Sequence, residues 1–193
     1  MDPSDQTLDE FLSSTASERV APAGGTASAV VGATGAALCE MVCIHTIGND
    51  ESAQGDVADA RDELRRVRER LLDLADADAR TVSDLFPADD GPDESTLKRS
   101  IGVPLAIADA CLTVLELAAT VAADGTRTAV VDAGTGVFLA RSALRASVFT
   151  ARSNLALVSD PSFVARIERR TAAIERDAEE ASEQAMQRIE QRA

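Results

Sequence analysis

Two glycines and a threonine stand directly before a long apolar stretch, in the segment Pro22-Ala23-Gly24-Gly25-Thr26. Glycines let the backbone approach a ligand closely, and the helix start that follows offers free N–H groups to an anion. The chemistry predicted here is the binding of an anion or a polar ligand. The alternative is a tight loop that only leads into the helix. The segment is not a P-loop, because the GxxxxGK[ST] spacing and its lysine are absent.

Two further groups of polar residues interrupt apolar runs. Asp132 precedes Ala133-Gly134 at the start of another apolar segment. A buried carboxylate there needs a donor or a ligand, whereas an exposed one would only complement the helix dipole. Arg152 and Asn154 stand inside the later part of that segment, either as binding groups or as ordinary surface residues.

Side chains that could bind a metal or act as nucleophiles are few. His45 is the only histidine, and it could serve either as a general base or as a structural residue of an apolar helix. The cysteines Cys39, Cys43 and Cys111 form no CxxC pair, so we expect no zinc or other metal site. Buried free thiols are the better interpretation, and they fit a reducing cytoplasm.

The elements that must position these residues are helices. Apolar residues recur at three- and four-residue steps, as in Leu64, Val67, Leu71 and Leu74, and no segment shows convincing alternation with a period of two. The pattern predicts an all-α antiparallel bundle of about five long helices plus a short N-terminal one, in a single domain over residues 1–193. The expected helices cover residues 8–12, 24–47, 56–85, 95–123, 128–157 and 161–191.

Local signals predict several helix ends. Thr7 and Glu10 have the spacing of a capping box, and Asp160-Pro161 has the order of an N-cap followed by proline. Ser95 is the expected cap of the helix over residues 95–123. Pro104 lies inside that helix and should kink or restart it, because its ring removes a hydrogen bond.

The charge of the chain argues against some partners. Its 193 residues include 33 Asp and Glu against 19 Lys and Arg, a formal net charge of −14, and Lys98 is the only lysine. Binding to nucleic acid and attraction to an anionic membrane both need clustered basic residues, so we expect neither partner. Many acids, much alanine and almost no lysine are typical of a protein adapted to high salt. An acidic cytosolic protein from a GC-rich genome is the alternative.

The apolar stretch over residues 24–47 is long enough to cross a membrane. Glu40, His45, the abundance of Ala and Gly and the lack of flanking basic residues argue against this. We expect a buried central helix whose small side chains let neighbouring helices approach closely. Because aromatic residues make up only 3% of the chain, the core must be built from Ala, Val, Leu and Ile.

Taken in order, these segments resemble the motifs of one family, the cyclodeaminase domain of formiminotransferase-cyclodeaminase with its stand-alone methenyltetrahydrofolate cyclohydrolase relatives. The order and spacing of the segments, over nearly the whole chain, carry the resemblance. The similar segments are Leu8-Asp9-Glu10-Phe11-Leu12, Pro22-Ala23-Gly24-Gly25-Thr26-Ala27-Ser28, Met41-Val42, Thr46-Ile47-Gly48, Val103-Pro104-Leu105-Ala106-Ile107-Ala108, Val131-Asp132-Ala133-Gly134 and Arg152-Ser153-Asn154-Leu155.

That resemblance implies an all-helical homodimer acting on a one-carbon unit at N5 and N10 of tetrahydrofolate, with no cofactor beyond this substrate. It implies that the glycine loop lines the folate pocket and that Asp132 binds the pterin or assists proton transfer. Because folate carries a glutamate tail, a local arginine would offset the repulsion by the acidic chain. The other residues that the resemblance places at the pocket are Gly24, Gly25, Thr26, Ser28, Arg127, Arg152 and Asn154.

The expected activity is hydrolysis of 5,10-methenyl-tetrahydrofolate to the 10-formyl form, since the chain has no formiminotransferase domain to supply formimino-folate. Cyclodeaminase activity, which expels ammonia from 5-formimino-tetrahydrofolate, attacks the same carbon and is the first alternative. A non-catalytic folate-binding or helical interaction protein is the second, because the chain departs from the family pattern at several positions. These departures include Asn49, Thr126, Thr128 and Val131.

Overall fold

The structure, a computed structural model, describes residues 2–49, 55–86 and 91–192, and within these residues it is helical with no strand. This confirms the all-α prediction. Five long helices and a short N-terminal one follow each other along the chain. The elements are η1 (Pro3–Asp5), α1 (Leu8–Thr15), α2 (Gly24–Asn49), α3 (Asp56–Leu85), α4 (Glu94–Asp124), α5 (Val130–Asn154), η2 (Leu155–Leu157) and α6 (Pro161–Arg192).

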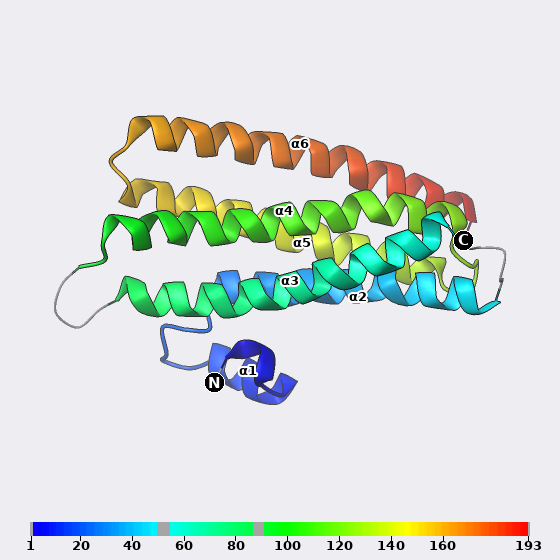
Figure 1. Cartoon of the computed structure of the whole chain (residues 1–193), viewed down its shortest axis with the longest axis horizontal. Helices are drawn as coiled ribbons and strands as arrows, with labels where there is room; N and C mark the ends of the chain where they lie inside the picture. The colour runs from blue at the N-terminus through cyan, green and yellow to red at the C-terminus, as the bar shows by residue number, and fades with distance from the viewer. Residues whose placement is uncertain (1, 50–54, 87–90, 193) are drawn as a thin grey trace.

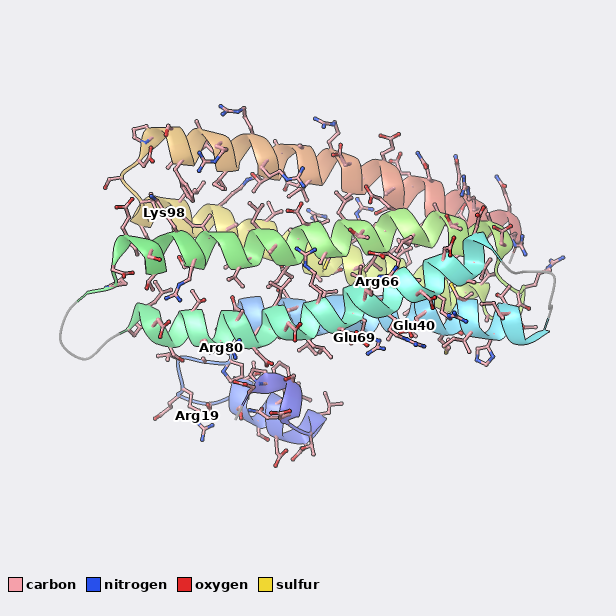
Figure 2. The ribbon with its side chains drawn as sticks, viewed as in Figure 1. Arg19, Glu40, Arg66, Glu69, Arg80 and Lys98 are labelled. Carbon is pink, nitrogen blue, oxygen red and sulfur yellow. The ribbon has the colours of Figure 1, made fainter. Side chains whose placement is uncertain are left out.

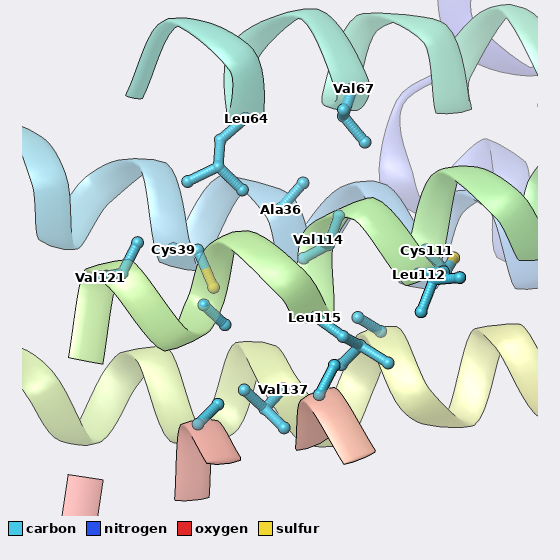
Figure 3. Packing of buried hydrophobic residues seen from close by; sticks show 14 of the residues in the cluster. Ala36, Cys39, Leu64, Val67, Cys111, Leu112, Val114, Leu115, Val121 and Val137 are labelled. Carbon is cyan, nitrogen blue, oxygen red and sulfur yellow. The ribbon is translucent and has the colours of Figure 1, made fainter. Parts of the chain in front are cut away.

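The long helices run alternately in opposite directions along one axis (Figure 1). In this view α3 and α4 lie in front of α2 and α5, α6 covers the upper side, and α1 sits apart below α3. The two helix layers enclose one large core cluster, made chiefly of Ala, Val, Leu, Ile and the three cysteines (Figure 3). Of the five phenylalanines only Phe11 is buried, so the expected aliphatic core is confirmed.

Small residues let α2 and α5 touch backbone to backbone. A Cβ atom added to Gly35 would lie 2.8 Å from the Gly136 carbonyl oxygen, and one added to Gly136 would lie 2.8 Å from the Gly35 carbonyl oxygen. Any larger side chain at either position would separate the helices. Both α2 and α4 are apolar and long enough to cross a membrane, yet 56% and 61% of their apolar windows are buried inside the bundle.

Most helix ends follow the predicted signals. Thr7 and Glu10 form the capping box of α1, and Asp160 Oδ1 accepts a hydrogen bond from the Phe163 N–H at the start of α6. The prediction that Ser95 caps α4 is wrong: Asp93 is the cap, and its carboxylate accepts from the Thr96 N–H at 2.7 Å. A carboxylate two residues earlier competes successfully because Asp is as good an N-cap as Ser.

Pro104 does not restart α4, which continues unbroken from Glu94 to Asp124. Proline has no N–H, so the Ser100 carbonyl one turn earlier loses its normal helical partner. The Asn154 side chain replaces that partner, because its Nδ2 donates to the Ser100 oxygen at 2.7 Å. A side chain at the end of α5 therefore completes the hydrogen bonding of α4.

Candidate functional site

The glycine loop forms the first turn of α2 and is held by a carboxylate from α3. The buried Thr26 hydroxyl donates to Asp78 Oδ2 at 2.8 Å, and Asp78 itself is buried. A Cβ atom added to Gly25 would lie 2.7 Å from the carboxyl carbon of Asp78, whereas Gly24 has open space around it. Glycine is thus required at position 25 by the close approach of Asp78, and Gly24 is the accessible end of the loop.

Burial raises the pKa of Asp78, and hydrogen bonds from the Thr26 side chain and backbone offset only part of that effect. The carboxylate therefore acts as a cap for α2 that comes from another helix. Sequence reasoning missed Asp78, because Ala75-Asp76-Ala77-Asp78 looks like a solvated face. A signal was present: Asp78 lies seven residues after Leu71, on the buried stripe of α3.

The structure gives the predicted hydroxyl ligands structural partners. Ser28 is buried and its hydroxyl donates to the Gly24 carbonyl at 2.7 Å, and Thr26 is fully buried against Asp78. Neither hydroxyl is directed at solvent. Both hydroxyls thus hold the backbone of the loop in place, and the expectation that Thr26 and Ser28 line a pocket stays a prediction.

Arg152 lies at the C-terminal end of α5, beside the groove between α5 and α6. Its guanidinium donates to Thr171 Oγ1 at 3.1 Å and to Glu175 Oε2 at 2.7 Å. An open hollow of about 440 Å³ is lined there by Arg145, Phe149, Arg152, Ser153 and Glu175. Asn154, by contrast, is committed to the Ser100 carbonyl, so its role in this chain is to hold α4 and α5 together.

The alignment of α2 against α5 places the glycine loop at the same end of the bundle as Arg152. The antiparallel helices α2 and α5 touch where Gly35 meets Gly136 and Ala140. Eleven residues before Gly35 is Gly24, and an equal step from the contact along α5 reaches residues 149–150. Gly24 is therefore level with Phe149 along the bundle axis.

Asp132 and Arg127 lie at the opposite end. Asp132 is exposed in the first turn of α5, 20 residues before Arg152, a separation of about 30 Å along the helix. Arg127 is exposed in the turn before α5, where the Thr126 N–H donates to Thr46 Oγ1 at 2.9 Å. One chain thus does not bring Asp132 and Arg127 together with the glycine loop. The departures Thr126 and Thr128 lie in this turn, and the Asn49 side chain lies outside the described residues.

A second buried carboxylate, Glu40, lies midway along α2 and faces α3 (Figure 2). Burial alone would raise its pKa, but hydrogen bonds and charges from Arg68 and Arg65 outweigh that effect and leave the pKa lowered. Arg68 Nε donates to it at 2.8 Å and Arg65 Nε at 3.1 Å. All its oxygens are engaged by arginine, so Glu40 joins α2 to α3 and is not placed to react.

The remaining candidate residues, one histidine and three cysteines, differ in exposure. His45 is exposed on α2, and Cys39, Cys43 and Cys111 are buried and free. Burial raises the pKa of Cys39 and Cys111 to about 12 and that of Cys43 to about 11, so these thiols stay protonated. In residues 2–49, 55–86 and 91–192, no three His, Cys, Asp or Glu side chains gather as a metal site.

Comparison with known proteins agrees with this arrangement of motifs. The formiminotransferase-cyclodeaminase family matches residues 7–173, most of the chain. The chain belongs to this family. A methenyltetrahydrofolate cyclohydrolase from Methylorubrum extorquens is 30% identical over 173 residues, which cover 82% of this chain and 83% of that protein. The resemblance seen in the motifs is thereby confirmed.

The fold is also that of the family. The crystal structure of formiminotetrahydrofolate cyclodeaminase from Thermotoga maritima superposes with a TM-score of 0.91 and covers 97% of each chain. Its sequence is 21% identical, so this likeness concerns the fold. The family thus uses one helical frame in proteins named for two folate reactions.

Proposed function

We propose that this chain is a methenyltetrahydrofolate cyclohydrolase. The observation that carries the proposal is the 30% identity to a protein of that name, over most of both chains. In this reaction water adds to the cationic methenyl carbon between N5 and N10 and loses one proton. The bond to N5 then breaks with protonation of N5, while the carbinol O–H loses its proton to form the formyl C=O, so one proton is released overall. The product is 10-formyl-tetrahydrofolate. Only positioning and proton transfer are required, so the proposal includes no metal and no cofactor beyond the folate.

The proposed roles follow from where the residues lie. Gly24 is open to solvent at the start of α2, where unpaired N–H groups favour a polar or anionic part of the substrate. Asp132 is the proposed proton carrier, because it is exposed and free to contact a ligand. Arg152 and Arg127 are the proposed partners of the glutamate tail. Gly25, Thr26 and Ser28 fix the conformation of the loop in this proposal, and Asn154 holds α4 and α5 together.

Cyclodeaminase activity is the alternative supported by the fold. Attack on the formimino carbon by N10 followed by loss of ammonia uses the same carbon and the same proton carriers as hydrolysis. The superposition with a formiminotetrahydrofolate cyclodeaminase supports a fold that could serve either reaction. The non-catalytic alternative rests on the departures at Thr126, Thr128 and Val131, which surround Asp132 in sequence.

The direct test follows the loss of methenyl-tetrahydrofolate absorbance in high salt, with and without the protein. We expect acceleration over the spontaneous reaction, and a loss of about 100-fold or more in Asp132→Ala, the usual scale for a proton-transfer group. Asp73→Ala, which removes an exposed carboxylate on α3, is the matched control and should keep full activity. Ammonia release from formimino-tetrahydrofolate would instead identify a cyclodeaminase, and no turnover of either substrate would refute both activities.

We further propose that residues 1–193 act as one domain in a cytoplasmic homodimer with a folate substrate. The core supports pairing: many of its side chains are alanine or cysteine, so one chain buries little apolar area for its length. The three free buried thiols suit a reducing compartment. Light scattering in high salt is expected to give twice the mass of the chain, and a monomer would count against the dimer.

A further inference from the structure

Arginines near the end of α6 bind the end of α4, which lies beside it (Figure 1). A helix leaves its last four carbonyl groups without helical partners, and arginine is a good donor to them. Arg192 donates through Nη1 to the Ala123 oxygen and through Nη2 to the Gly125 oxygen, the latter at 2.6 Å. One turn earlier in α6, Arg188 Nη1 donates to the Ala119 oxygen at 2.7 Å. The end of α6 thus supplies donors to α4 and to the turn that follows it.

The turn that joins α4 to α5 is fixed from three directions. From α6, Arg192 holds the Gly125 oxygen. From α2, Thr46 Oγ1 accepts a hydrogen bond from the Thr126 N–H at 2.9 Å. A Cβ atom added to Gly125 would collide with the Val121 oxygen, so the turn also packs closely against the end of α4. Because Gly125 and Thr46 are buried, these contacts are shielded from water, and the position of the turn is set by α2, α4 and α6 together.

A series of backbone hydrogen bonds leads from this turn to Asp132. The Thr126 oxygen accepts hydrogen bonds from the N–H groups of Ala129 and Val130, both at 3.0 Å. The Ala129 oxygen in turn accepts from the Asp132 N–H at 2.9 Å. In the part of the chain that the structure describes, the exposed Asp132 carboxylate forms neither an ion pair nor a hydrogen bond, so the backbone sets its position. Asp132 is therefore placed by the turn that Arg192 holds.

The end of α6 also contacts the first turns of α5 directly. Ile189 is buried, and a Cβ atom added to Gly134 would lie 3.6 Å from its Cδ1 atom. That is an ordinary packing distance, so Ile189 lies against α5 two residues after Asp132. Ile189 and Arg192 are three residues apart and share one side of α6. The same side of α6 therefore contacts both the turn before α5 and the beginning of α5.

We propose that Arg192 is a positioning residue, which fixes the proton carrier Asp132 through the turn between α4 and α5. This inference rests on the proposed function for the role of Asp132, while the contact itself rests on the geometry. Guanidinium suits the task because its rigid fork donates to two carbonyl oxygens at once, a geometry that a lysine ammonium does not present. The match to the family ends at residue 173, so the matched residues do not include Arg192. The end of α6 thus contributes to the proposed site without contacting the folate.

Turnover by Arg192→Ala tests the proposal, with Arg188→Ala as the matched control. Both substitutions remove an arginine that joins α6 to α4 and should lower the Tm, but only Arg192 contacts the turn. Below the Tm of both variants, we expect the kcat for methenyl-tetrahydrofolate to fall about 10- to 100-fold in Arg192→Ala, with a smaller change in KM, because a misplaced proton carrier affects the transition state most. Arg192→Lys, which can still donate to one carbonyl, should recover part of the kcat. Arg188→Ala should keep the kcat of the wild type.

Hydrogen exchange tests the contact without using activity. In Arg192→Ala the amides of Val130 and Asp132 should exchange about tenfold faster than in the wild type, the scale of losing one hydrogen bond to the turn. Arg188→Ala should leave both exchange rates unchanged. Unchanged rates in Arg192→Ala, or an equal loss of kcat in the two alanine variants, would show that the end of α6 only stabilises the fold and would overturn the proposal. If the wild-type protein turns over neither folate, the proposed function fails, and the exchange rates still decide whether Arg192 holds the turn.

Discussion

Asp78 joins the proposed folate loop to α3. The carboxylate accepts from Thr26 and lies against the Gly25 backbone, so it fixes the first turn of α2. Burial disfavours the charged form of Asp78, while the loop requires a hydrogen-bond acceptor at this position. An uncharged acceptor of the same shape would satisfy the loop without that penalty.

We therefore predict opposite effects for two substitutions of Asp78. Asp78→Asn keeps the acceptor for Thr26 and should preserve or raise the free energy of unfolding at neutral pH. Asp78→Ala leaves the Thr26 hydroxyl without a partner and should cost about 1–3 kcal/mol. Because the folded-state pKa of Asp78 is raised, wild type gains stability as the pH falls through it, and the advantage of Asp78→Asn should shrink toward about pH 4. Urea unfolding at several pH values measures this, and a pH-independent difference would contradict it.

Local sequence signals indicated candidate site residues but not the residues that contact them in the fold. Glycine before an apolar run predicted the loop, and a lone carboxylate predicted Asp132, because both signals are local. Asp78, Ser100 and Thr171 were missed as partners, since each contact joins helices far apart in the chain. Side-chain periodicity says which face is buried but not which helix covers it.

At the scale of elements, the bundle compensates for Pro104 with a side chain from another helix. Periodicity predicted that α4 exists, and its ends came within a residue or so. Whether Pro104 breaks the helix depended on Asn154, which is 50 residues away and donates to the carbonyl that proline leaves free. The continuity of α4 thus depends on a hydrogen-bond donor from α5.

The two residues should therefore be energetically coupled. Asn154→Ala leaves the Ser100 carbonyl without its donor and should cost about 1–3 kcal/mol in the free energy of unfolding. In a Pro104→Ala background the backbone N–H that the substitution restores can donate to that carbonyl, so removing Asn154 should cost less. Denaturant unfolding of wild type, Asn154→Ala, Pro104→Ala and the double variant gives the coupling free energy. Asn154→Asp, whose side chain cannot donate, is the size-matched control. An equal loss of unfolding free energy on Asn154→Ala in both backgrounds would show that Asn154 does not compensate for Pro104.

At the scale of the whole molecule, charge is distributed by helix. The α2/α5 layer carries two acidic residues, whereas α6 alone carries Glu168, Glu175, Asp177, Glu179, Glu180, Glu183 and Glu190. Ion pairs offset part of this, as between Arg152 and Glu175 at 2.7 Å and between Arg66 and Glu63 at 2.6 Å. Exposed pairs of this kind contribute about 0–1 kcal/mol each, so they do not remove the repulsion of an excess of 14 negative charges.

Salt should consequently stabilise this protein, although it weakens its ion pairs. Raising the ionic strength from about 0.01 M to about 1 M shortens the Debye length from about 30 Å to about 3 Å, which screens repulsion across the whole surface. Thermal unfolding followed by circular dichroism should therefore give a Tm that rises steadily over this range. Replacing the exposed Glu183 and Glu190 by Gln should raise the Tm at low salt and reduce the increase of the Tm with salt concentration. A Tm that falls with salt would mean that the ion pairs outweigh the net charge, and it would refute adaptation to high salt.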